Sequence, residues 1–451
     1  MVQRNELTRR CPKSVHGSTG SPRTDHDTIK INREAARLER AEACPERGPL
    51  GSDVEGDAQR ITTQSFHGEK EYGMIDWARI HDQKSFSAMT PALACFSFLY
   101  GAAVRLRVQA YPVKKKKALP GFVVSVGNLT VGGTGKTPAT IMIAQWAAAE
   151  GFQPAVLSRG YGGKRNKAVL EVSDGKDLLA RPEEAGDEPY LIAKKLPGIP
   201  VIVSPNRYNA GLLAREKHAA NFFILDDGFQ HIALKRDLDL VLMDSHRPFG
   251  NGHLLPWGPL REPLHHLSRA DAFLLTRADP DGKDATGATE EFLKRRFQKP
   301  LFLSAHVPEK IVFPHGNKEY NTSFLKGKRV TAFAGLARPN AFRETVLALG
   351  AEVVSFKAFR DHHVYVPGQI LQLIREKDRA GADCLITTEK DWVRIEGALK
   401  ECPDLAYLRI RFAIANESKN FFEMIKEKAE KSGVRRKGGK QNALSGKHPR
   451  M

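Results

Sequence analysis

The chain has 451 residues, of which 41% are hydrophobic and 27% are charged, so it has enough apolar residues for more than one folded core. Its formal net charge of +18 favours an anionic partner such as nucleic acid, a nucleotide or an acidic lipid surface. The five cysteines are scattered and form no CxxC pair, which argues against a disulfide framework and against a thiolate zinc site.

The N-terminal part of the chain changes character twice. Residues 1–73 are rich in charged residues, Gly, Ser and Pro, so we predict a disordered extension that cannot bury enough apolar surface to fold. An apolar run at 91–104, about half the length of a membrane-spanning helix, is followed by Arg105, Arg107 and the lysines at 114–117. We predict an amphipathic membrane-associated segment over 74–117, and a core helix followed by a solvated lysine turn is the alternative.

From residue 118 onward, short apolar runs alternate with helical patterns, which predicts an α/β fold with a parallel sheet. We expect a P-loop NTPase-like domain over 118–306, an inter-domain linker over 307–328, a second, smaller α/β domain over 329–431 and a basic disordered tail over 432–451. The predicted strands are 122–126, 155–157, 201–203, 222–225, 238–243, 272–275, 329–334, 351–356, 384–387 and 405–410.

The strand predicted at 122–126 leads through a glycine-rich loop into a helix predicted at 137–150. The loop consists of Thr130, Val131, Gly132, Gly133, Thr134, Gly135, Lys136 and Thr137. Glycines let backbone N–H groups approach phosphates closely, and the positive end of the helix favours the same anion. Lys136 is therefore predicted to contact the phosphates of a nucleotide, and Thr137 to ligate Mg²⁺. The general pattern has Gly where Thr130 stands.

Two acids, Asp226 and Asp227, end the apolar strand at 222–225. A P-loop enzyme places a carboxylate there to hold Mg²⁺, so Asp226 is the predicted metal ligand. A second strand ends at Asp244, for which a cap or turn role is the stronger interpretation.

Three further sites have two interpretations each from the residues alone. Asp187 begins a predicted helix, where a carboxylate either complements the helix dipole or does chemistry. Arg261 and Glu262 follow a Gly/Pro-rich loop of the kind that often carries sites. His362 has a histidine neighbour, and a lone histidine is more often structural than catalytic.

A GTPase is the runner-up interpretation, because Thr276 to Asp279 have the pattern of a guanine-reading loop. That class also requires a DxxG spacing after its second metal strand. Here Gly228 directly follows the two acids, so the spacing fails.

These motifs, in this order, resemble the tetraacyldisaccharide 4'-kinase family of lipid A biosynthesis, and the resemblance extends over roughly residues 87–428. The family tolerates a small hydroxyl residue at the position of Thr130, whereas Ile232 and Trp257 depart from its pattern. The matching stretches are SVGN at 125–128, SRGYGG at 158–163, GDEP at 186–189, DDGFQH at 226–231, the loop from Gly250 to Pro263, DH at 361–362 and TEKD at 388–391.

The resemblance implies phosphoryl transfer from ATP, with Mg²⁺, to the 4'-hydroxyl of a tetraacylated glucosamine disaccharide 1-phosphate. It also implies two α/β units with the active cleft between them, and an enzyme at the cytoplasmic face of the inner membrane. Asp187 is then the proton acceptor with His362 as its partner, and Asp227, Arg261 and Glu262 are supporting residues. An anionic membrane surface and an acylated disaccharide lipid are the expected partners; we expect neither nucleic acid nor an obligate protein partner.

Overall fold

The computed structural model describes residues 89–111, 116–164, 167–278, 286–397 and 402–436. The chain divides into a unit of Met1–Met74 and a unit of Ile75–Met451, and all the described residues belong to the second unit. The predicted extension over 1–73, residues 74–88, Lys114, Lys115 and the tail beyond residue 436 lie outside the described residues.

The first lobe is built around β1 (Phe122–Asn128), whose seven residues are all buried. β1 pairs in parallel with β5 (Phe222–Asp226) on one side and with β6 (Leu238–Asp244) on the other. The carboxyl ends of these strands therefore meet at one edge of the sheet, which is where open α/β sheets bind ligands. The other strands of this lobe are β2 (Pro154–Ser158), β3 (Leu170–Ser173), β4 (Val201–Val203) and β7 (Ala272–Thr276).

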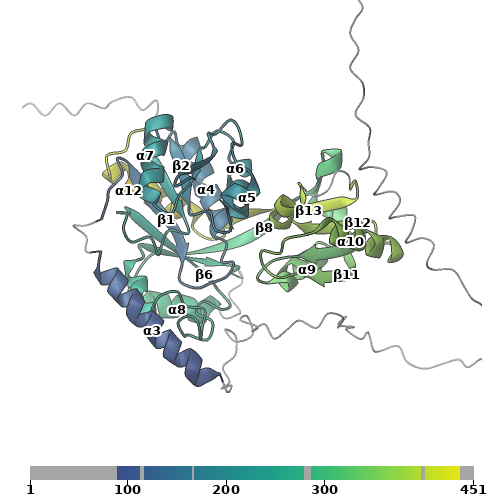
Figure 1. Ribbon diagram of the computed structural model, residues 1–451, viewed down its shortest axis with the longest axis horizontal. Coiled ribbons are helices and arrows are strands. Elements are labelled where there is room, and N and C mark those ends of the chain that lie inside the picture. Colours follow the sequence, from purple (N-terminus) through teal and green to yellow (C-terminus); the bar gives the residue numbers. More distant parts are fainter. Residues whose placement is uncertain (1–88, 112–115, 165–166, 279–285, 398–401, 437–451) are drawn as a thin grey trace, which may run out of the picture. The chain divides into compact units, whose positions relative to one another are not determined.

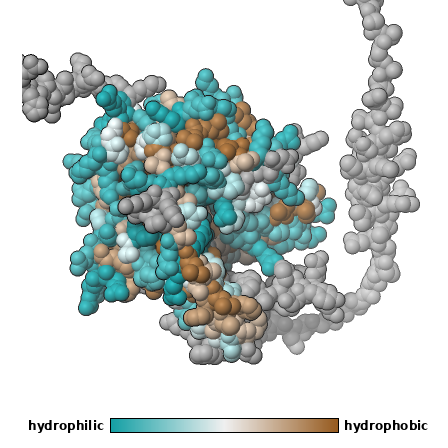
Figure 2. All heavy atoms as spheres, turned by 60° about the vertical axis from the view of Figure 1, so that its left-hand side comes forward, coloured by the Kyte–Doolittle hydropathy of each residue, from teal (hydrophilic) through white to brown (hydrophobic). Residues whose placement is uncertain are grey.

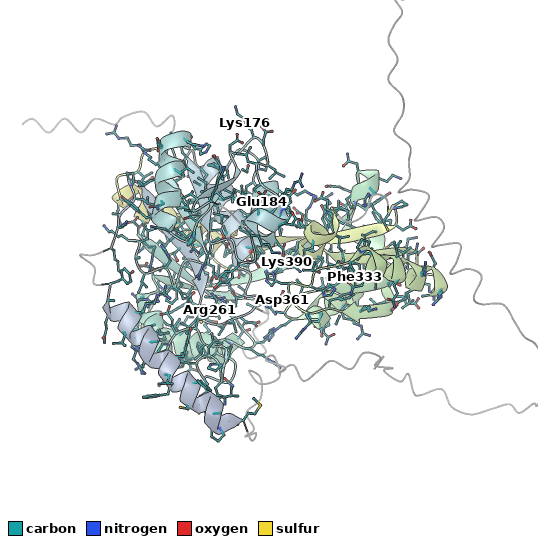
Figure 3. All side chains as sticks on the ribbon, viewed as in Figure 1. Lys176, Glu184, Arg261, Phe333, Asp361 and Lys390 are labelled. Atoms are coloured by element: carbon teal, nitrogen blue, oxygen red, sulfur yellow. The ribbon has the colours of Figure 1, made fainter. Side chains whose placement is uncertain are left out.

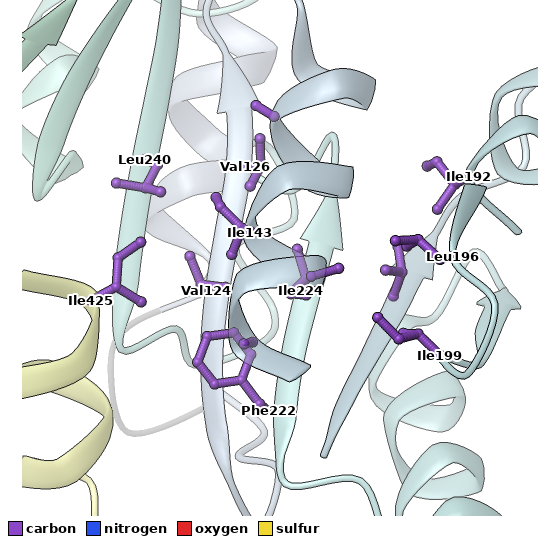
Figure 4. Close-up of a cluster of buried hydrophobic side chains, with 14 of the residues drawn as sticks. Val124, Val126, Ile143, Ile192, Leu196, Ile199, Phe222, Ile224, Leu240 and Ile425 are labelled. Carbon is purple, nitrogen blue, oxygen red and sulfur yellow. The ribbon is translucent and has the colours of Figure 1, made fainter. Parts of the chain in front are cut away.

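Helices cover the sheet of the first lobe and bury its apolar side chains. Figure 4 shows Val124 of β1 and Phe222 of β5 packed with Ile143 of α4 in one cluster, which Ile425 joins from the end of the chain. The helices of this lobe are α4 (Lys136–Ala149), α5 (Pro182–Ala185), α6 (Asp187–Lys195), α7 (Arg207–His218), η2 (Leu264–Arg269) and α8 (Thr286–Phe297).

The second lobe is a smaller α/β unit, as the sequence predicts (Figure 1). β10 (Arg329–Ala334) pairs in parallel with β11 (Glu352–Ala358) and with β12 (Cys384–Thr388), and β12 pairs in parallel with β13 (Leu405–Ile414). Its helices are α9 (Pro339–Ala348), α10 (Pro367–Arg379) and α11 (Glu389–Ile395).

One sheet runs through both lobes, because β8 (Leu301–Phe313) pairs in parallel with β7 and antiparallel with β13. The segment 307–328, predicted as a linker, is therefore regular structure: it holds the second half of β8, η3 (Pro314–Gly316), β9 (Lys318–Asn321) and η4 (Thr322–Leu325). Pro308 interrupts the apolar pattern of β8, and a register shift in the β13 pairing next to Pro308 accommodates it.

Helix α3 (Thr90–Gln109) has an unusual division of side chains between its faces. Its buried residues, Thr90, Leu93, Ser97 and Gly101, are mostly small or polar. Phe96 and Phe98 are instead 61% and 71% exposed, and Figure 2 shows hydrophobic residues gathered along this helix. At 20 residues, α3 is longer than the predicted run at 91–104, and by length and composition alone it is able to cross a membrane.

The end of the chain returns to the first lobe through α12 (Ser418–Lys431), whose Phe421, Ile425 and Ala429 are buried in its core cluster. The first residues of the tail predicted from residue 432 contact the first lobe, although Ser432, Gly433 and Arg435 are exposed. The Arg435 carbonyl accepts a hydrogen bond from Asn221 at 2.8 Å, and Arg436 pairs with Glu150 at 3.4 Å. The predicted tail from residue 437 onward lies outside the described residues, so its disorder stays a prediction.

Candidate active site

A cleft of about 3120 Å³ opens between the two lobes. Every residue of the glycine-rich loop at 130–137 lines it from the first lobe, and the loop at the start of α9 lines it from the second. Figure 3 labels Arg261 on the first lobe, and Asp361 and Lys390 on the second, around this region. Sites for one drug-sized ligand have about 300–1,000 Å³, so this cleft has room for two sizeable substrates.

The glycine-rich loop has the strand–loop–helix setting that the sequence predicts, with β1 before it and α4 beginning at Lys136. Gly132 and Gly135 have φ angles of 107° and 83°, which residues with a side chain rarely adopt. A Cβ at Gly135 would also lie 2.8 Å from Nε2 of His306 on β8. The Asn128 amide donates to the Thr130 carbonyl at 2.7 Å and ties the loop to the end of β1.

The Lys136 ammonium is paired with Asp227, the residue directly after the predicted metal ligand Asp226. Its Nζ lies 3.7 Å from Asp227 Oδ1, and the Arg261 guanidinium donates to both Asp227 oxygens at 2.9 Å. Burial alone would raise the pKa of Asp227, but the charges of Lys136 and Arg261 hold it below its usual value. The loop lysine is thus pre-positioned by an ionised carboxylate.

Asp226 lies deeper than Asp227 and is only 3% exposed. Its carboxylate accepts hydrogen bonds from Ser158 at 3.1 Å and from Thr140 at 3.3 Å. Burial, together with the charges of Glu188 and Asp227, raises the pKa of Asp226 to about 7. A cation bound nearby would offset both the burial and the repulsion between these acids.

The structure brings Asp187 and His362 together from different lobes. Asp187 opens α6 in the first lobe, and His362 follows β11 in the second with a φ of 61°. His362 Nδ1 lies 3.7 Å from Asp187 Oδ2, which is longer than a hydrogen bond. Burial would raise the pKa of Asp187, but His362 and Arg394 beside it lower that pKa to about 2.

Two cations beside this pair were missed by the motif analysis, although Lys390 lies within the TEKD stretch at 388–391. Lys390 Nζ lies 3.0 Å from Glu188 Oε1 and 3.3 Å from His362 Nε2. Arg394 Nε donates to Asp187 Oδ2 at 2.7 Å. The available signal was the position of TEKD at the carboxyl end of β12, the sheet edge that also carries the other site residues.

Glu262 does not line the cleft, contrary to its grouping with Arg261 in the sequence. It is 3% exposed and accepts from His266 at 2.6 Å, and Arg269 pairs with it at 2.8 Å. Successive residues of an extended loop point to opposite sides, so Arg261 faces the cleft while Glu262 packs behind it.

The stretch that suggested guanine recognition has a different partner. Arg277 donates to the Gly133 carbonyl of the loop and lies 3.2 Å from Asp244, which Arg338 of the second lobe also contacts at 2.8 Å. Asp279 lies outside the described residues.

Basic side chains also gather near the two acids, and the sequence did not indicate this cluster, although Arg159 lies within SRGYGG and His231 within DDGFQH. Arg207 is buried, and burial lowers its pKa to about 10. Burial and the charge of Arg207 lower the pKa of His231 to about 3. Both residues line the cleft with Arg159 and Arg107, so this wall favours an anionic group.

The family model described as Tetraacyldisaccharide-1-P 4'-kinase matches residues 89–430. The chain belongs to this family. It is 40% identical over 362 residues to the Tetraacyldisaccharide 4'-kinase of Syntrophus aciditrophicus, covering 78% of this chain and 96% of that protein. It is 42% identical over 349 residues to the enzyme of the same name from Desulfatibacillum aliphaticivorans, covering 75% of this chain and 92% of that protein.

The fold of the family is also seen in a solved structure. The crystal structure of LpxK from Aquifex aeolicus in complex with ATP aligns with a TM-score of 0.60 and 34% identity, covering 76% of this chain and 99% of that one. The α/β class expected from the sequence is therefore confirmed, and so is membership of the kinase family.

Proposed function

We propose that this protein transfers the γ-phosphate of ATP to the 4'-hydroxyl of a tetraacylated glucosamine disaccharide 1-phosphate in lipid A biosynthesis. The chain belongs to this kinase family, and the observation that carries the proposal is the composition of its interlobe cleft. One wall is a phosphate loop with Lys136, and the opposite wall supplies His362 to meet Asp187. Phosphoryl transfer depends on positioning and electrostatics, and this arrangement offers both.

The glycine-rich loop is the proposed site for the ATP phosphates. Its backbone N–H groups and the N-terminus of α4 attract anions, and Lys136 adds a full positive charge. Because Asp227 already holds the Lys136 ammonium, binding needs little reorganisation of that side chain.

Thr137 and Asp226 are the proposed protein groups for Mg²⁺. Hard oxygen atoms suit this ion, which commonly takes one or two protein ligands, substrate phosphates and water. The raised pKa of Asp226 also fits such a site, because a nearby cation favours its ionised form. Bound there, Mg²⁺ would neutralise phosphate charge during transfer.

Asp187 and His362 are the proposed proton acceptor for the 4'-hydroxyl. A carboxylate and an imidazole that act as a pair take up a proton near neutral pH better than either alone. The two groups come from different lobes, so the pair exists only when the lobes are docked.

The phosphate and the acyl chains of the lipid acceptor are proposed to meet two different parts of the protein, the basic wall of the cleft and α3. Arg159, Arg207 and the neighbouring basic groups suit its phosphate. The exposed phenylalanines of α3 suit a membrane that holds its acyl chains, because exposing one methylene to water costs about 0.8 kcal/mol. We assign the enzyme to the cytoplasmic face of the inner membrane, peripheral or monotopic, on an anionic surface.

The proposal is tested with radiolabelled ATP and the tetraacylated disaccharide 1-phosphate in mixed micelles. Label must enter the lipid, and the product must carry it at the 4' position. GTP in place of ATP tests the GTPase alternative, and nucleotide hydrolysis without lipid phosphorylation would overturn the kinase assignment.

A further inference from the structure

The Arg394 side chain lies where the two lobes meet at the proposed proton acceptor. It comes from α11 of the second lobe, and its side chain is 5% exposed. Its Nε donates to Asp187 Oδ2 at 2.7 Å, and its Nη2 lies 3.1 Å from His362 Nδ1. One guanidinium therefore contacts both members of the pair.

The remaining nitrogen anchors Arg394 in its own lobe. Nη1 donates to the Gly335 carbonyl at 3.3 Å and to Asp391 Oδ1 at 3.2 Å. Asp391 is itself fully buried and accepts from the Gly335 N–H and from the Tyr365 hydroxyl, both at 3.0 Å, and from Thr388 at 2.6 Å. A Cβ at Gly335 would lie 2.8 Å from the Asp391 carboxylate, so a larger residue would disturb this anchor. The guanidinium is thus held in one orientation.

The distance between Asp187 and His362 shows why their contacts with Arg394 matter. Asp187 and His362 are 3.7 Å apart, too far for a direct hydrogen bond, whereas each is within hydrogen-bond distance of Arg394. The planar fork of arginine fixes two acceptors at once, which the point charge of lysine does not.

We propose that Arg394 is a positioning residue for phosphoryl transfer, joining Asp187 of one lobe to His362 of the other and setting the geometry of the pair. The inference rests on the proposed function of that pair. It adds a physical link between lobe docking and chemistry, because the group that orients the acceptor carboxylate is supplied by the opposite lobe.

The alternative role for Arg394 is purely structural: it would only hold the two lobes together. A second ion pair beside α6 and α11 provides a control for that role. Lys194 of α6 and Glu396, just after α11, form another ion pair between the lobes at 2.7 Å. Their side chains are 37% and 38% exposed, and neither touches Asp187 or His362 in a hydrogen bond. Glu396→Gln removes a contact across the same helix pair without changing the groups around the proton acceptor.

The full chain is assayed as wild type, Arg394→Gln, Arg394→Lys, Glu396→Gln and Asp187→Asn. Arg394→Gln should lower kcat at least ten-fold with little change in KM for ATP. It should also move the acid limb of the kcat–pH profile to higher pH, because Asp187 loses the cation that stabilises its ionised form; His362, Lys390, Glu188 and Asp361 remain nearby. Arg394→Lys should recover part of kcat, and Glu396→Gln should leave both kcat and the profile unchanged.

Several outcomes would overturn the proposal. If Arg394→Gln lowers only the midpoint of denaturation and keeps the wild-type kcat and pH profile, Arg394 serves cohesion alone. If Asp187→Asn is fully active, the acceptor assignment fails, and the positioning role fails with it. If Asp187→Asn is inactive while Arg394→Gln is normal, only the role of Arg394 fails. A double-mutant cycle of Arg394→Gln with Asp187→Asn in denaturant unfolding, without substrates, tests the contact independently, and zero coupling would refute it.

Discussion

The Lys136 ammonium lies 3.7 Å from Asp227, the acid that directly follows the buried Asp226. The carboxylate that faces the phosphate loop is thus already paired with a cation, while the one behind it has a raised pKa. The two adjacent acids have different environments and, we infer, different tasks.

Lys136→Ala should leave the fold intact and lower kcat by on the order of 10³-fold, because the lysine neutralises charge on the transferred phosphoryl group. Radiolabel transfer to the lipid measures kcat, and circular dichroism checks the fold. Lys176→Ala removes the same charge from an exposed site that does not line the cleft, and it should be fully active. Near-normal turnover by folded Lys136→Ala would refute the role of the loop.

Asp187→Asn and His362→Ala should each lower kcat far more than they weaken ATP binding. Their double variant should be little worse than the worse single one, as for residues that act as a unit. Steady-state kinetics and equilibrium nucleotide binding separate the two effects. Losses in kcat that multiply in the double variant would show that the two groups act independently.

Stability should fall in mild acid because of His306. Burial lowers the pKa of this histidine from 6.5 to about 4, so the unfolded chain takes up a proton near pH 6.5 that the native protein refuses. Its contribution is complete above pH 6.5 and is lost progressively as pH falls toward 4, by about 3 kcal/mol at most. His306→Gln should flatten this part of the stability–pH curve in urea unfolding. An unchanged slope in the variant would contradict the assignment.

The exposed face of α3 should determine membrane binding. Phe96→Ser combined with Phe98→Ser removes two large apolar groups, each worth roughly 2 kcal/mol when buried, and should weaken vesicle binding at least ten-fold. Co-sedimentation with anionic vesicles measures the effect. Leu371→Ser, at a 50% exposed site on α10 of the second lobe, is the control and should bind as wild type. Equal binding by all three proteins would favour a helix that only packs on the protein.

The N-terminal extension should be dispensable. A chain that begins at Met74 keeps the whole region matched by the family model, 89–430, and is expected to have full kinase activity and vesicle binding. Loss of either property on truncation would assign a role to residues 1–73.

The phosphate loop was predictable because its function depends on a local order of strand, glycines, lysine and helix, all within one stretch of sequence. The place of Asp226 at the end of a buried strand was predictable for a similar reason, and its role as a metal ligand stays a prediction. The residues alone left His362 undecided, because its partner lies in another lobe and no local pattern encodes that distance. Arg394 was missed because a basic residue in a short helix ordinarily faces solvent, whereas contacts with Asp391 of its own lobe and Asp187 of the other hold this one at 5% exposure.

The junction of the lobes shows a second limit of sequence patterns. The segment from residue 307 was predicted as a linker because it lies between the two sets of predicted strands, and Pro308 interrupts the alternation that marks a strand there. The strand continues because its partner β13 shifts register beside that proline. The register shift lies in β13, about 100 residues away along the chain, so the local sequence pattern around Pro308 cannot reveal it.

The return of α12 to the first lobe has a consequence for how the protein is made. Phe421, Ile425 and Ala429 complete a core cluster that also contains Val124 and Ile143. On the ribosome, the nascent phosphate-binding lobe therefore lacks part of its interior until residues 418–431 have been translated, which follow the last strand of the second lobe. The synthesis of the phosphate-binding lobe therefore begins before that of the second lobe and ends after it.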